Sequence, residues 1–200
     1  MLQGTDIGQM ETALRIFKTA FIAIMVFMPI QETGAQMLSV KNNLLYDVTM
    51  TPNLGFELVV GEHTTIAANL MGNSKPLGKD VKMLAFQPEY RYYFSGRPMF
   101  KHFVGLGAIA GSYDITWKGK IYDGIACGAG LVFGYVHKLN KRLNLDFHAG
   151  FGAVAYKQKE YFEGDNYDGD FSVNGEVKSN ASGYTLIPTD IGISLTYILK

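Results

Sequence analysis

The chain has few charged residues and no excess of either sign. Charged side chains make up 18% of its 200 residues, below the roughly 25% of ordinary soluble domains. The 18 basic and 18 acidic residues balance to a formal net charge of zero. Because no basic field is available to attract phosphates, the composition argues against a protein that binds nucleic acid.

Cysteine and helical periodicity are scarce as well. Cys127 is the only cysteine, which excludes an intramolecular disulfide, and the chain has no CxxC motif or His/Cys spacing of the kind that binds metals. Beyond the N-terminal region no apolar pattern repeats every 3.6 residues, so almost no helix is expected. Glycine and aromatic residues are plentiful instead, with 23 Gly, 12 Tyr and 13 Phe. This composition suits a strand-rich chain with close backbone contacts.

A short apolar run near the N-terminus is typical of a secretory signal. Basic residues precede the run Thr19–Ile30, which is too short to cross a membrane because a spanning helix needs about 20 apolar residues. Thr33 and Ala35 follow at the −3 and −1 positions of a small-residue cleavage site. We therefore expect residues 1–35 to be a cleaved signal peptide and residues 36–200 to form one domain. A buried N-terminal helix is the alternative.

The rest of the chain alternates apolar residues with small or polar ones, the period of a β-strand. From Leu143 to Ala155 the odd-numbered residues are all apolar, whereas the even-numbered residues from Arg142 to Gly152 are polar or glycine. In Leu186–Lys200 a line of isoleucines and leucines is interrupted by Thr189. The expected strands are Val40–Thr49, Leu54–Val60, Thr65–Gly72, Lys82–Phe94, His102–Thr116, Gly124–Val136, Arg142–Ala155 and Leu186–Lys200.

Turn signals between these strands give connections of alternating length. The connections around Gly61, Ser95 and His137 are short. The longer ones are Asn73–Val81, Lys118–Asp123 and Lys157–Asn180. An even number of strands of about ten residues, joined in this way, is typical of outer-membrane proteins. The expected fold class is all-β: an eight-stranded antiparallel up-and-down transmembrane β-barrel, preceded by a cleaved signal peptide and located in the cell outer membrane.

This barrel predicts which face each residue occupies. The apolar residues, including Ile187 to Leu199 of the last strand, are expected to face lipid, and the polar ones to face the lumen. Charges inside a barrel must be paired, because an isolated buried charge is very costly. We expect a lumenal polar network that rigidifies the barrel. Its candidate members are Glu57, Glu89, Arg91, Arg142, Asp146, His148 and Asp190.

Three other functions remain as alternatives. A narrow pore is disfavoured because eight strands leave little free bore. A secreted lipocalin-like barrel that binds a ligand would need its apolar face inside, yet the glycine-rich, charged face is the one small enough to be interior. A lipid-modifying enzyme would need a serine, a histidine and an acid side by side, and the sequence places Ser112 and His102 at different heights of one strand. No catalysis, metal or cofactor is expected.

The long connection Lys157–Asn180 is acidic but also contains aromatic residues. From Asp165 it departs from the spacing of a calcium-binding loop, so a solvated surface loop is the default. Its aromatic residues would suit contact with a cell-surface protein or glycan. They are Tyr161, Phe162, Tyr167 and Phe171.

Several segments carry a family resemblance. The segments near the start of the expected domain are Lys41, NLLYD (Asn43–Asp47), TPNLG (Thr51–Gly55) and Glu57. Further along the chain they are FQPEYRYYF (Phe86–Phe94), His102–Gly105 and RLNLDFHAGFG (Arg142–Gly152). The chain resembles a family of small outer-membrane β-barrel proteins of unknown function from anaerobic Gram-negative gut bacteria. The resemblance implies a barrel of the OmpA/OmpX-like kind and no known activity. The last residues, Tyr197–Lys200, look like the signal that barrel-insertion machinery recognises. The expected partners are therefore this machinery and outer-membrane lipid.

Overall fold

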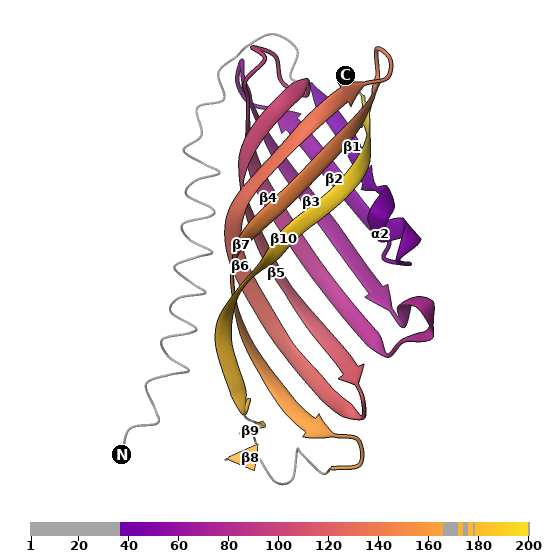
Figure 1. Ribbon diagram of the computed structural model, residues 1–200, viewed down its shortest axis with the longest axis vertical. Coiled ribbons are helices and arrows are strands. Elements are labelled where there is room, and N and C mark those ends of the chain that lie inside the picture. The colour runs from indigo at the N-terminus through magenta and orange to yellow at the C-terminus, as the bar shows by residue number, and fades with distance from the viewer. Residues whose placement is uncertain (1–36, 166–171, 174–175, 178, 200) are drawn as a thin grey trace, which may run out of the picture. The chain divides into compact units, whose positions relative to one another are not determined.

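The computed structural model describes residues 37–165, 172–173, 176–177 and 179–199, and they form an all-β barrel (Figure 1). Eight strands run antiparallel and close into a ring in the order β1-β10-β7-β6-β5-β4-β3-β2. The predicted fold class is confirmed in its up-and-down order and its closure. The predicted signal peptide, with its cleavage site, and two aromatic residues of the long connection, Tyr167 and Phe171, lie outside the described residues.

The strands lengthen from the start of the chain toward its end, from 6 residues in β1 to 20 in β7. The barrel strands are β1 (Leu38–Asn43), β2 (Asn53–Val59), β3 (Thr64–Ser74), β4 (Val81–Tyr93), β5 (Lys101–Trp117), β6 (Lys120–Lys138), β7 (Leu143–Phe162) and β10 (Ala181–Ile198). The shorter elements are α2 (Leu44–Val48), the 3-10 turn η1 (Pro76–Gly78), β8 (Ser172–Val173) and β9 (Glu176–Val177). β8 and β9 form a separate two-stranded sheet among the described residues.

Two predicted boundaries are wrong for local reasons. The first predicted strand ends at Asn43, whose side chain accepts a hydrogen bond from the backbone N–H of Leu45 and so starts α2 instead. The expected long connection Lys118–Asp123 is a two-residue turn, with φ of 52° at Lys118 and 77° at Gly119. Two residues with positive φ make the tight turn that matches strand twist, so β5 and β6 stay paired up to it.

Neither of the helical elements is of a kind that spans a membrane: within the described ranges no helix is long and apolar enough. The short connections β2–β3, β4–β5 and β6–β7 share one end of the barrel with the C-terminus, at the top of Figure 1. We call this the short-turn end and the opposite one the long-strand end.

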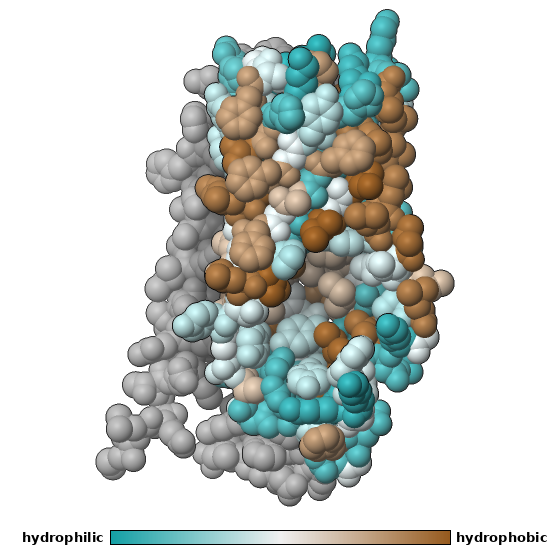
Figure 2. Space-filling view, in the orientation of Figure 1, coloured by the Kyte–Doolittle hydropathy of each residue, from teal (hydrophilic) through white to brown (hydrophobic). Residues whose placement is uncertain are grey.

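The predicted alternation of faces is confirmed along most strands. In β6, Leu131 and Phe133 are exposed on the outside while Val132 between them is buried inside. In β7, Phe147 and Phe151 point outward and Asp146 and His148 inward. Figure 2 shows the hydrophobic side chains gathered in a band over the upper half of the barrel, with hydrophilic ones along the top edge and toward the lower part.

The facing of Ile187 is the exception. The register between β10 and β7 shifts by one residue between Pro188 and Asp190, so Thr189 forms a bulge. Such a bulge is a usual place for proline, which has no N–H to give to a ladder. Upstream of it the two faces exchange: Ile187 lies opposite the inward Gly152, and Leu186 opposite the outward Ala153. Ile187 therefore points into the barrel, and its predicted outward position is wrong.

Candidate functional site

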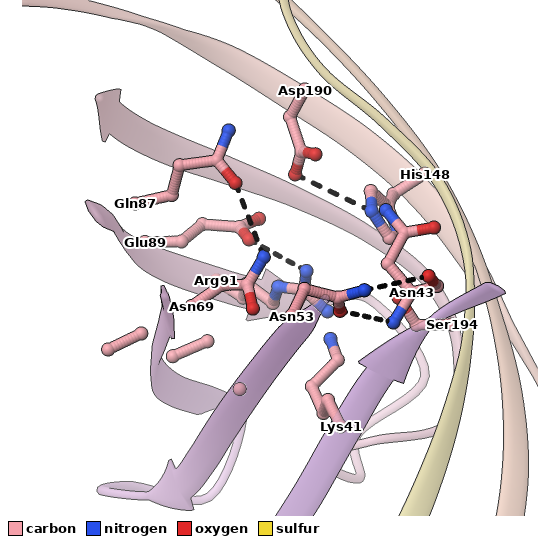
Figure 3. A pocket seen from close by; sticks show the side chains of 13 residues that line it. Lys41, Asn43, Asn53, Asn69, Gln87, Glu89, Arg91, His148, Asp190 and Ser194 are labelled. Carbon is pink, nitrogen blue, oxygen red and sulfur yellow. Dashed lines mark hydrogen bonds and ion pairs between the residues drawn. The ribbon is translucent and has the colours of Figure 1, made fainter. Parts of the chain in front are cut away.

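Six of the seven predicted network residues converge inside the barrel toward the short-turn end. They are Glu57 of β2, Glu89 and Arg91 of β4, Asp146 and His148 of β7, and Asp190 of β10. Figure 3 shows Glu89, Arg91, His148 and Asp190 around one small cavity, together with Lys41 of β1. We call these seven side chains the charge cluster.

Arg91 lies at the centre of the charge cluster and is 2% exposed. Its Nη1 lies 2.6 Å from Asp146 Oδ2 and 3.5 Å from Glu57 Oε2, and its Nη2 lies 2.7 Å from Glu89 Oε2. Lys41 Nζ approaches two of the same acids, at 2.5 Å from Asp146 Oδ2 and 3.2 Å from Glu57 Oε2. Because the two cations share Glu57 and Asp146, they form one network rather than separate ion pairs.

Neutral side chains add hydrogen bonds to this network. Thr65 Oγ1 and the Tyr93 hydroxyl each donate to Glu57 Oε1, both at 2.7 Å. The Arg91 guanidinium lies over the Phe103 ring, 4.3 Å from its centre, where the ring's negative face attracts a cation. A buried carboxylate with this many donors can keep its charge away from water.

His148 links the network to β10. Its Nδ1 lies 3.3 Å from Asp146 Oδ1, and its Nε2 lies 3.5 Å from Asp190 Oδ2. The Tyr46 hydroxyl of α2 donates to Asp190 Oδ1 at 3.2 Å, so the helix that replaces the end of the first predicted strand also supports the cluster. Gly192 leaves room for this arrangement, since a Cβ there would displace the side chains of Asn43 and His148.

The cluster leaves little open space. The cavity beside Glu89 and Arg91 has a volume of about 30 Å³, room for about one water molecule. Glu89 Oε1 and Arg91 Nε border this region and have no hydrogen-bond partner within the described residues. The charged side chains thus fill most of the lumen at this height.

Arg142 lies apart from the charge cluster. It is exposed in the turn before β7, where its backbone N–H donates to Asn140 Oδ1 at 2.9 Å. Lys41, Tyr93 and Thr65 contribute instead, and the sequence analysis did not select them. The inward parity of Tyr93 in the alternation of Lys82–Phe94 was a signal for it, whereas the six-residue β1 is too short for its alternation to single out Lys41.

The remaining candidate residues lie far from the charge cluster. Phe162 is exposed at the end of β7, beside Tyr161. Close by, Lys120 Nζ donates to Glu160 Oε2 at 2.5 Å and Gln158 Nε2 to Glu160 Oε1 at 2.7 Å. The hydrogen bond from Lys120 has the largest effect on the pKa of the Glu160 carboxyl, which it lowers, and the hydrogen bond from Gln158 lowers it further.

The residues considered for an enzyme do not meet. The His102 ring lies 4.7 Å from that of Tyr135, tilted by 58°, near the short-turn end. Ser112 lies far along the same strand, opposite Leu84 and Ile125. Within the residues that the structure describes, no three His, Cys, Asp or Glu side chains come close enough to hold a metal ion.

We expect Arg91→Ala to lower the free energy of unfolding by about 3–5 kcal/mol, because it leaves Asp146 and Glu89 buried without their main cation. The matched control is Arg142→Ala, which removes an exposed arginine and should change stability by less than about 0.5 kcal/mol. Urea unfolding of the protein folded in detergent measures both. Equal losses for the two variants would contradict the central place of Arg91.

Comparison with known proteins is informative at the level of the family. The family model described as a protein of unknown function (DUF3575) matches residues 20–199. No curated protein and no solved structure matches the chain. The match covers the whole barrel, including every member of the charge cluster, and the chain belongs to this family, DUF3575.

Proposed function

We propose that the protein is an outer-membrane β-barrel of the OmpA-like kind in a Gram-negative cell, with a structural or surface-interaction role and no catalysis. Its direct partners would be outer-membrane lipid and the machinery that inserts barrels. The single observation that carries the proposal is the reversal of polarity across the wall near the short-turn end. There, charged side chains are buried inside while aromatic and aliphatic side chains are exposed outside.

The outward apolar surface forms a continuous band. Paired residues on neighbouring strands share a face, and one such row contains Tyr90, Leu106, Leu131 and Phe151. In β6 the outward apolar residues run from Ile125 to Tyr135, within the roughly 9–11 residues that a tilted strand needs to cross the hydrocarbon. In water such a band would be an aggregation hazard, but in a bilayer it is the expected surface.

Closure of the sheet supports the same proposal. In hydrocarbon an unpaired strand edge would leave backbone N–H and C=O groups without partners. β1 and β10 pair from Ser39↔Ile198 to Asn43↔Ser194, which closes the ring at the height of the band. The charge cluster then fills the lumen inside, so the structure supports a sealed scaffold over a pore.

The location is tested by separating membranes of cells that express the full chain. We expect the protein in the outer-membrane fraction, with Gln36 as its first residue after removal of a signal peptide. Sequencing of the N-terminus from the purified fraction checks both. An intact N-terminus on a soluble periplasmic protein would contradict the proposal.

The lipid-facing band is tested with a single charge. Phe151→Arg places an arginine in the middle of the band and should cost about 2–4 kcal/mol of folding free energy in bilayers. Ser182→Arg is the control, because Ser182 is exposed and lies beyond the band. Folding into lipid vesicles, followed by gel mobility of the unheated protein, compares the two. Equal tolerance at both sites would show that the band does not face lipid.

The sealed lumen predicts electrical behaviour. In planar bilayers the wild-type protein should show no stable large channel, because the charge cluster blocks the bore. Arg91→Ala should give conductance only together with a loss of stability. A large steady wild-type conductance whose ion selectivity, but not stability, changes in Arg91→Ala would favour the narrow pore instead.

A further inference from the structure

We infer that the long-strand end of the barrel binds an aliphatic chain of an amphiphile, in an apolar cavity between β10 and β4–β5. This cavity has a volume of about 370 Å³, at the lower end of the range for small-molecule sites. It is separate from the small cavity in the charge cluster. Its walls include Met83, Ile109, Ile115, Val154 and Ile187.

The cavity lies where the polarity of the barrel wall is the opposite of that in the band. Beyond the band, one row of paired residues is charged on the outside: Lys82, Asp114, Asp123 and Lys159. At this same end of the strands the inward residues are Val81, Met83, Tyr113 and Ile115. A wall that is polar outside and apolar inside is that of a water-soluble ligand-binding barrel rather than a membrane pore. Apolar walls around an open space gain free energy when an apolar ligand replaces water there.

The bulge at Thr189 brings β10 into this cavity. By exchanging the faces of the strand, it points Thr185 and Ile187 inward, where both line the cavity. Gln87 Nε2 donates to the Thr189 backbone carbonyl at 2.9 Å, and this polar bridge separates the cavity from the charge cluster. The cavity therefore has an apolar wall and a polar boundary on the side of the charge cluster.

Among the described residues, no strand closes the side of the barrel beside the upstream part of β10. β1 pairs with β10 only as far as Ser194, and among the described residues the part of β10 upstream of Thr189 has β7 as its only strand partner (Figure 1). On this strand Tyr184 is 87% and Leu186 67% exposed. Apolar outward side chains thus border the opening, which makes it continuous with the lipid-facing band. An acyl chain can reach the cavity sideways without crossing the charged row.

Polar groups at the outer end of the cavity suit the head of such a ligand. The Tyr113 hydroxyl donates to Gln158 Oε1 at 2.5 Å, and both residues line the cavity. Gln158 Nε2 in turn donates a hydrogen bond to Glu160 Oε1, and Lys120 Nζ donates one to Glu160 Oε2. A molecule with one apolar chain and a polar head would place the chain against Ile109 and Ile187 and the head toward these groups.

Photolabelling of the folded full chain tests the site in two ways. In one sample the protein lies in phosphatidylcholine vesicles doped with a phosphatidylcholine that carries a diazirine at the end of one acyl chain. In the other it lies in undoped vesicles to which diazirine-bearing hexadecanoic acid is added. After illumination, mass spectrometry of peptides maps the adducts. We expect adducts on cavity residues such as Met83 and Ile187 in addition to those on the outer band.

The two samples distinguish the source of the chain. Cavity adducts from the doped lipid indicate that a membrane lipid enters beside β10, a result that rests on the proposed membrane location. Cavity adducts from the free acid alone indicate a chain taken from solution, and they support the site whatever the location. Adducts confined to outward residues such as Leu131 and Phe151 in both samples would overturn the inference.

A matched pair of variants on β6 adds a control. Ala126 lines the cavity, whereas Ala129 is exposed on the outer face of the same strand. Ala126→Phe should fill the cavity and reduce adducts on Met83 by about tenfold, the effect of losing a few methylene contacts. Ala129→Phe should leave them unchanged. Where Ala126→Phe does not fold, the adduct map of the wild-type protein decides alone.

Discussion

The structure near the short-turn end depends on one constraint: two cations and four carboxylates must share a narrow lumen that has room for about one water molecule. Lys41 and Arg91 can hold Glu57 and Asp146 only if all four reach the same point from β1, β2, β4 and β7. The facing strands must leave room for them, and glycine supplies it. A Cβ on Gly105 would lie 2.8 Å from Glu89 Oε1. The glycines of the inner face and the buried charges therefore depend on each other, because long charged side chains fit in the lumen only where small residues lie opposite.

The bulge at Thr189 divides the barrel into two parts with different interiors. Downstream of it Asp190 points inward and meets His148, so β10 contributes to the charge cluster. Upstream of it Ile187 points inward and contributes to the apolar cavity. A strand with one uninterrupted alternation would have put Ile187 and Asp190 on opposite faces of the wall. With a single extra residue, the same strand presents a carboxylate to one part of the interior and an apolar side chain to the other.

Alternation along the sequence was enough to predict eight strands, their order and most of the facing, because burial of one face leaves a period of two wherever a strand is regular. Most of the charge cluster followed from that facing. The failures lie where regularity ends. Arg142 has the inward parity but precedes the first residue of β7, and parity has no meaning outside the ladder. The tight turn at Lys118 and Gly119 depends on positive φ, which the neighbouring polar residues did not reveal. Pro188 was the available signal for the bulge that turns Ile187 inward.

Upstream of Thr189, β10 pairs with β7 alone within the described part of the chain, and the features of this strand explain how such an edge is tolerated. An exposed strand edge invites pairing with other chains unless something on the strand opposes it. Here Pro188 removes one N–H donor, and the bulge next to it shifts the register of the ladder. α2 covers the edge just downstream, through the hydrogen bond from Tyr46 to Asp190. The opening is thus bounded by a proline and a bulge on the long-strand side of the charge cluster, whereas on the short-turn side β1 closes the ring. A barrel built this way can hold closely packed charges at one end and still leave one side of its apolar cavity accessible.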